Sequence, residues 1–81
     1  MAELTVGQRI SICRKRKGLS QQELSRICGF DSSIISRFET GERTPSFEKL
    51  LLMAKVLEVN PEKLMDKPLR KKYRFLLKSF P

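Results

Sequence analysis

Two short helices joined by a tight turn are predicted by the stretch LSQQELSRICGFDSSIISRFETG, residues 19–41. The first helix begins with a capping box, in which the Ser20 hydroxyl and the Glu23 carboxylate satisfy free amides at the helix start. Glycine adopts the left-handed conformation of a helix C-terminus without steric cost, so Gly29 ends this helix. Its apolar positions at helical spacing are Leu24, Ile27 and Cys28. The rest of the chain is organised around this two-helix unit.

The second helix of the unit divides into an apolar and a polar side. Phe30 is expected to be a buried plug in the turn, and Asp31 is expected to be the N-cap. Ile35 and Phe38 then point inward. The outward positions are Ser32, Ser33, Ser36 and Arg37. Small hydroxyl donors beside one arginine suit the edges of bases in a DNA major groove.

The motif residues resemble the helix-turn-helix of the Cro/C1-repressor type, the Xre family. The matching positions are Gln21, Gly29, Ile35-Ser36-Arg37 and Glu39-Thr40-Gly41, within a resemblance that extends from about Val6 to Met65. This resemblance implies an all-α, compact five-helix lambda-repressor-like domain. It also implies a homodimer on double-stranded DNA, each subunit placing a recognition helix, residues 32–40, in the major groove of one half of a palindromic operator.

The same resemblance assigns roles to individual residues. The base-reading positions are Ser32, Ser33, Ser36 and Arg37, and the positions facing the DNA backbone are Gln21, Gln22, Thr40 and Arg43. Arg14 and Glu39 are expected to form a partly buried ion pair that ties the first helix to the recognition helix. Plainer interpretations stay open for some of these residues. Ser32 and Ser33 could serve only as helix caps, and Arg43 could serve only to keep its loop soluble.

The remaining helices follow from apolar spacing and caps. Thr5 and Gln8 form a second capping box before a helix over residues 6–17. Ser46 caps a broadly apolar fourth helix, and Asn60-Pro61 starts a short fifth helix over residues 62–65. We therefore expect a DNA-binding domain over residues 1–66, followed by a basic amphipathic extension over residues 67–81 that forms a short helix.

Charge is concentrated in this extension. The chain of 81 residues carries a formal charge of +8, and six of its basic residues but none of its acidic residues lie from Lys67 onward. Such a surplus favours polyanionic partners, with nucleic acid first and anionic membrane second. A domain of this size is only marginally stable alone, which makes a dimer plausible.

The dimer surface is expected where apolar residues exceed the needs of the core. These residues are Leu52, Val56, Val59, Leu64 and Met65 on the fourth and fifth helices, with Leu69, Tyr73, Leu76 and Phe80 on the extension. For the extension, cover over the domain's own core is an equally good interpretation.

Several function classes are excluded by composition. The chain has no histidine and only two cysteines, so neither a zinc site nor a histidine-based catalytic triad can be built, and we expect no metal, no cofactor and no enzyme. The N-terminus lacks the apolar core of a signal peptide, which predicts a cytosolic protein with reduced thiols.

The leading hypothesis is a sequence-specific DNA-binding regulator, most simply a repressor that occupies an operator. A small phage-type repressor, a controller of a restriction system and an antitoxin paired with a toxin protein all stay open within this class. The alternative is an interaction module whose basic tail binds a protein partner or an anionic membrane, although no membrane partner is expected under the leading hypothesis.

Overall fold

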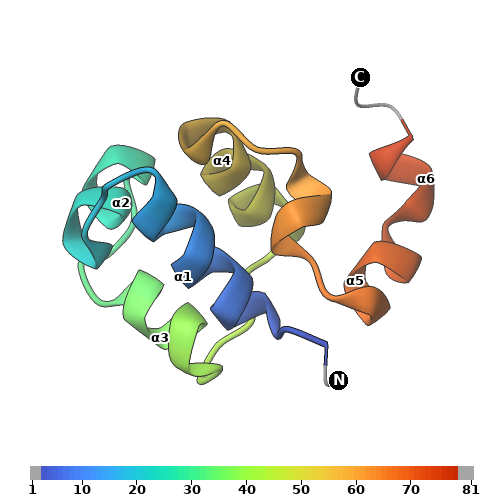
Figure 1. The fold of residues 1–81 in the computed structure, drawn as a ribbon, viewed down its shortest axis with the longest axis horizontal. Helices are drawn as coiled ribbons and strands as arrows, with labels where there is room; N and C mark the ends of the chain where they lie inside the picture. Colours follow the sequence, from blue (N-terminus) through green and yellow to red (C-terminus); the bar gives the residue numbers. More distant parts are fainter. Residues whose placement is uncertain (1–2, 79–81) are drawn as a thin grey trace.

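The computed structural model describes residues 3–78, and every regular element in this range is a helix (Figure 1). In chain order these are α1 (Val6–Arg16), α2 (Gln21–Cys28), α3 (Ile34–Thr40), α4 (Phe47–Leu57), the 3₁₀ helix η1 (Pro61–Leu64), α5 (Lys67–Lys72) and α6 (Arg74–Leu77). Helix α1 packs against α3 and η1, while α2 packs against α3 and α4. The all-α fold expected from the sequence is confirmed, with the fifth helix formed as a 3₁₀ turn.

The helix caps follow the sequence. The Thr5 hydroxyl accepts a hydrogen bond from the Gln8 amide at 3.1 Å, and the Ser20 hydroxyl accepts one from the Glu23 amide at 3.0 Å. In both cases the side chain of the third residue reaches back to the amide of the cap residue. Gly29, at φ 74°, ends α2 in the left-handed conformation. Both predicted capping boxes are therefore present.

The core is mostly aliphatic and draws on all the larger helices. Its buried members are Val6, Ile10, Cys13, Leu24, Cys28, Ile35, Phe38, Leu50, Met53, Ala54, Leu57, Leu64, Met65 and Leu77. Leu64 and Met65 are completely buried in this core, so the expectation that they line a dimer surface is wrong. Ile27 was expected inside α2 but is 53% exposed, because its neighbours Leu24 and Cys28 occupy the inward face of this short helix.

The extension packs on its own domain. Asp66 caps α5 by accepting a hydrogen bond from the Leu69 amide, and Leu69 and Tyr73 pack against the core while Leu77 is buried in it. The Tyr73 ring lies against the Phe47 ring, with centroids 4.4 Å apart. The helix breaks at Tyr73, which leaves Leu76 half exposed. Of the predicted tail positions, Phe80 lies outside the described residues.

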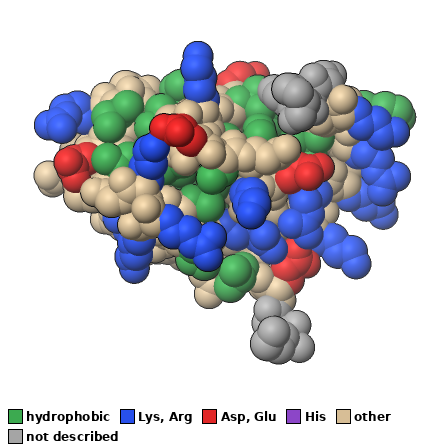
Figure 2. All heavy atoms as spheres, turned by 45° about the horizontal axis from the view of Figure 1, so that its top comes forward, with side chains coloured by type: hydrophobic (Ala, Val, Ile, Leu, Met, Phe, Trp, Pro, Cys, Tyr) green, Lys and Arg blue, Asp and Glu red, His purple; other side chains and the backbone are tan. Residues whose placement is uncertain are grey.

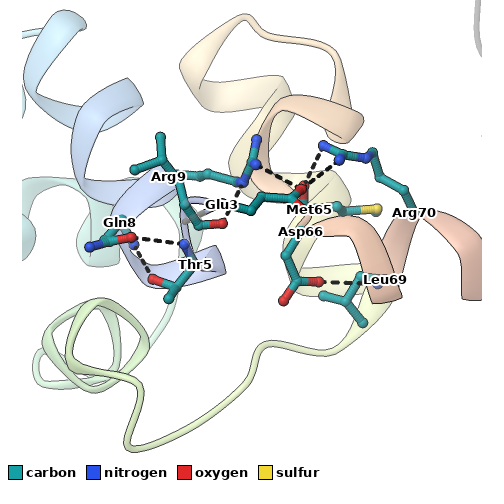
Figure 3. A network of polar contacts seen from close by, with 9 residues as sticks. Glu3, Thr5, Gln8, Arg9, Met65, Asp66, Leu69 and Arg70 are labelled. Atoms are coloured by element: carbon teal, nitrogen blue, oxygen red, sulfur yellow. Dashed lines mark hydrogen bonds and ion pairs between the residues drawn. The ribbon is translucent and has the colours of Figure 1, made fainter. Parts of the chain in front are cut away.

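One carboxylate links the start of the chain to the extension (Figure 3). Glu3 accepts a hydrogen bond from Arg9 of α1 at 3.1 Å and one from Arg70 of α5 at 2.6 Å. Arg70 also donates to the Met65 carbonyl oxygen. Glu3, which precedes α1, thus connects α1 with α5.

Helix α1 approaches α3 closely at Gly7. A Cβ atom at this position would lie 2.5 Å from the carbonyl oxygen of Glu39 and closer still to that of Phe38. Only a residue without a side chain fits here, so the orientation of α3 depends on this glycine as well as on the core.

Candidate nucleic-acid interface

Helix α3 presents a polar stripe to solvent while its apolar residues hold it to the domain. Ile35 and Phe38 are buried beneath it. The outward stripe consists of Ser33, Ser36, Arg37 and Thr40, of which Arg37 is 48% exposed and Ser36 is half buried. These positions recur at the spacing that places residues on one side of a helix. The outward side of α3 therefore presents only polar side chains.

The start of α3 differs from the prediction. Asp31 is not its N-cap, because the helix begins at Ile34 and Ser33 occupies the cap position with no side-chain hydrogen bond. The Asp31 carbonyl oxygen accepts from the Ile34 amide, and Ser32 and Ser33 form the exposed turn before the helix. The predicted recognition helix is thus shorter by two residues, and both serines stand at its tip. Phe30, just before this turn, is half buried against the core.

A buried polar cluster fixes α3 to α1 and α2. Arg14 donates from Nε to Glu39 Oε2 at 2.6 Å and from Nη2 to Glu39 Oε1 at 3.0 Å. Its remaining nitrogen donates to the Leu19 carbonyl oxygen at 2.8 Å. Gln21 Nε2 donates to Glu39 Oε1 at 3.0 Å. The predicted ion pair is present and bidentate, with both side chains only 9% exposed.

The cluster favours the charged form of both partners. Burial raises the pKa of Glu39, but the hydrogen bonds from Arg14 and Gln21 together with the Arg14 charge outweigh burial, so this pKa lies below its usual value. The hydrogen bond to Glu39 raises the pKa of Arg14 against the opposing effect of desolvation. The pair therefore remains ionised at neutral pH.

The residues predicted to face a DNA backbone flank α3. Gln21 begins α2 and is half buried, since it shares its amide with Glu39, whereas Gln22 beside it is exposed. Thr40 is the last residue of α3 and Arg43 lies in the turn after it, and both are exposed. A primary amide has a second N–H donor, so Gln21 can still donate outward while it binds Glu39. The structure thus places Gln21 beside Glu39 of α3, and Thr40 and Arg43 at the C-terminal end of this helix.

A cationic surface lies on the extension. A groove between η1 and the tail helices is lined by Glu62, Lys67, Arg70, Lys71, Arg74, Leu77 and Lys78. Figure 2 shows lysine and arginine side chains gathered at the end of the molecule that α5 and α6 form. In Figure 1 the end of α6 lies on the opposite side of the molecule from α3. This cationic groove is therefore separate from the polar stripe of α3.

Other types of site find little support in residues 3–78. No three histidine, cysteine or acidic side chains in this range are grouped to hold a metal ion. None of the helices described is both long enough and apolar enough to cross a membrane. Cys13 and Cys28 are buried, unpaired thiols, and burial raises the pKa of Cys28.

Two contacts near α3 are not predicted by the sequence pattern. Glu42 pairs with Arg37 across the turn that ends the helix, and Gly7 receives the backbone of α3. Glu42 follows Arg37 by five residues, with Gly41 between them. This spacing predicts an ion pair only once it is known that the chain reverses at Gly41. Gly7 carried no local signal, because its role depends on a helix distant in the sequence.

An exposed polar helix held against its predecessor in a small all-helical domain defines the helix-turn-helix class of DNA-binding proteins. The helix-turn-helix family model matches residues 10–64. The chain therefore belongs to the helix-turn-helix family of the Xre, or Cro/C1-repressor, type.

Relatives known by name are regulators. The chain is 33% identical over 60 residues to repressor protein C2 of Salmonella phage P22, which covers 74% of this chain but only 28% of that protein. Identity is also 33% over 60 residues to the uncharacterised HTH-type transcriptional regulator y4dJ of Sinorhizobium fredii, covering 74% of this chain and 78% of that one. The chain thus spans little more than a quarter of the P22 protein.

Solved structures agree with the fold. The P22 c2 repressor in complex with a synthetic operator matches with a TM-score of 0.72 and 32% identity, covering 78% of this chain and 96% of that one. The DNA-bound biofilm regulator SinR matches with a TM-score of 0.72 and 38% identity, covering 76% of this chain and all of that one. The fold is that of repressor-type DNA-binding domains.

Proposed function

We propose that this protein is a sequence-specific, double-stranded DNA-binding transcription regulator that represses by occupying a palindromic operator as a homodimer, acting by binding and not by catalysis. The observation that carries the proposal is the exposed polar stripe of α3, fixed to α1 and α2 by the buried Arg14–Glu39 pair. A rigid, outward helix of this kind fits a major groove. The operator-bound P22 c2 repressor and DNA-bound SinR support it by similarity.

In this proposal four side chains read bases: Ser32, Ser33, Ser36 and Arg37. Arg37 supplies most of the discrimination, because a bidentate arginine–guanine contact contributes about 1–3 kcal/mol. The serine hydroxyls can donate to several bases or accept from them, and so discriminate less. Ser32 and Ser33 act from the turn before α3, where they meet the groove first.

Four further side chains contact phosphate: Gln21, Gln22, Thr40 and Arg43. Gln21 and Gln22 stand at the start of α2, whose free amides and dipole favour an anion, while Thr40 ends α3 and Arg43 follows it. Contacts of this type fix the register of the domain on the duplex but carry no sequence information.

The proposed dimer interface is smaller than the sequence indicated. Leu52, Val56 and Val59 are exposed or half buried at the α4 end of the domain, and Leu76 is half exposed on the tail. Leu69 and Tyr73 pack inward and contribute at most their edges. Two linked half-sites raise affinity through effective concentration without new base contacts.

Selection from a random duplex library tests this proposal directly. We expect enriched sequences to be palindromic, with half-sites about one helical turn apart. Arg37→Ala should erase preference at particular base pairs while leaving affinity for random duplex nearly unchanged. If no sequence is enriched, or if Arg37→Ala weakens every duplex equally, the assignment of Arg37 to base reading is wrong.

The tail groove favours a second candidate, an interaction module for an acidic protein surface or an anionic membrane. Its five cations and the exposed Phe75 beside them are the observations in its favour. Anionic vesicles at low salt separate the two candidates. Vesicle binding without any preferred duplex sequence would favour the module over the regulator.

A further inference from the structure

Arg37, the main base-reading residue of the proposed function, is held by an acidic partner on its own chain. Its Nε lies 3.2 Å from Glu42 Oε2, and the two side chains are 48% and 62% exposed. Both groups therefore remain open to a ligand while they touch each other. No other acidic side chain forms an ion pair with Arg37 in the described part of the chain.

The turn after α3 builds this contact. Gly41, at φ 84°, reverses the chain so that residues 42 and 43 return along the helix end. The Arg37 carbonyl oxygen accepts hydrogen bonds from the Thr40 hydroxyl and the Arg43 amide, each at 3.2 Å. The Glu42 amide lies 3.4 Å from the Thr40 hydroxyl oxygen and donates to it. The backbone carrying Glu42 is thus attached to the backbone carrying Arg37.

The position of the carboxylate on the guanidinium matters. Guanidinium has five N–H donors in a fixed fork, so a carboxylate on the Nε side leaves the edge formed by the two terminal nitrogens free. That edge can donate two parallel hydrogen bonds to guanine O6 and N7. An arginine already ordered in this way loses less side-chain freedom on binding.

We propose that Glu42 is a positioning residue for sequence recognition, an inference that rests on the proposed function. It orders Arg37 with the terminal edge toward the base, and its own negative charge lowers affinity for duplexes that offer no matching base. Glu42 therefore increases the ratio of specific to random binding while it decreases total affinity for DNA.

The test compares the affinity of each full-length variant for a duplex selected by the wild-type protein with its affinity for a random duplex. Glu42→Ala should tighten binding to the random duplex and reduce the specificity ratio by about three- to tenfold. Glu42→Gln should tighten random binding in the same way, but it should retain most of the ratio, since its side chain keeps the shape of the carboxylate and presents an oxygen acceptor beside Nε.

Two controls separate positioning from charge. Glu62→Ala removes one exposed acidic charge from η1, away from the α3 turn, and should leave the ratio unchanged. In an Arg37→Ala background, Glu42→Ala should no longer alter the ratio. Thermal unfolding of each variant should match the wild type, because an exposed ion pair adds little stability.

The outcomes also separate this inference from the proposed function. If the wild-type protein binds selected and random duplexes equally, the regulator proposal itself fails. If the wild type discriminates but Glu42→Ala changes both affinities by one common factor, Glu42 acts only as a charge and the positioning role is refuted. A lower ratio for Glu42→Ala that Glu42→Gln restores supports it.

Discussion

Removing Arg14, the positive member of the buried cluster, should cost a large part of the protein's stability. In Arg14→Met the Glu39 carboxylate would lose both hydrogen bonds from Arg14 and keep that from Gln21 while staying buried. Loss of one partner of a buried pair costs about 3–5 kcal/mol, and the remaining bond places the cost near 3 kcal/mol. A chain of 81 residues has about 4–12 kcal/mol in total. The melting temperature should therefore fall by about 12–24 °C.

Urea unfolding followed by circular dichroism measures this cost, with Arg16→Met as the matched control. Arg16 is exposed on the same helix, and its loss should cost less than about 0.5 kcal/mol. The double variant Arg14→Met/Glu39→Leu should be more stable than Arg14→Met alone, since no buried charge is left without a partner. A loss below about 1 kcal/mol for Arg14→Met would refute this account of the cluster. So would a double variant whose loss of stability equals the sum of the losses in its two single variants.

Three further predictions follow from the site and its supports. The folded pKa of Glu39 lies below its unfolded value of 4.5, so its contribution to stability is fully present above pH 4.5 and is lost as the pH falls through the folded pKa. Urea midpoints measured from neutral pH downward should therefore decline less steeply in Glu39→Gln than in the wild type. An equal decline in both proteins would contradict this role of Glu39. Gly7→Ala should lower the free energy of unfolding by about 1–3 kcal/mol, because the new methyl group would clash with α3. At an open helical position the same change would raise the free energy of unfolding, so a stabilised variant would refute the close approach of α1 and α3. Arg43→Ala should weaken binding to all duplexes and reduce the logarithmic salt slope by about 1, and an unchanged slope would exclude a phosphate contact.

The parts of the fold that depend on local chemistry could be predicted from the sequence. Capping boxes and left-handed glycines act within one turn of chain, and the starts of α1 and α2 follow from them. The Arg14–Glu39 pair was predictable only through the family resemblance, since nothing local joins residues so far apart. Its geometry then agreed in full, including the bidentate contact.

The errors lie where tertiary packing overrides local preference. Asp31 has good capping chemistry, but the Phe30 amide donates to the Ser25 carbonyl oxygen and keeps this segment with the end of α2, so that α3 starts later. The tail was read as one helix from its apolar spacing, yet Tyr73 stacks on Phe47 and the helix breaks there. Neither contact can be inferred from a periodic pattern.

The residues that hold α3 in place are separate from those on its outer stripe, and this separation has an evolutionary consequence. The side chains that set its angle, Arg14 and Glu39 with Gly7 beneath, all face the domain interior, and none of them belongs to the outer stripe. Under the proposed function, changes at Ser33, Ser36 or Arg37 should therefore alter the preferred target with little loss of stability. Proteins with this scaffold could then come to prefer different DNA sequences, because most substitutions on the outer stripe would leave the fold intact.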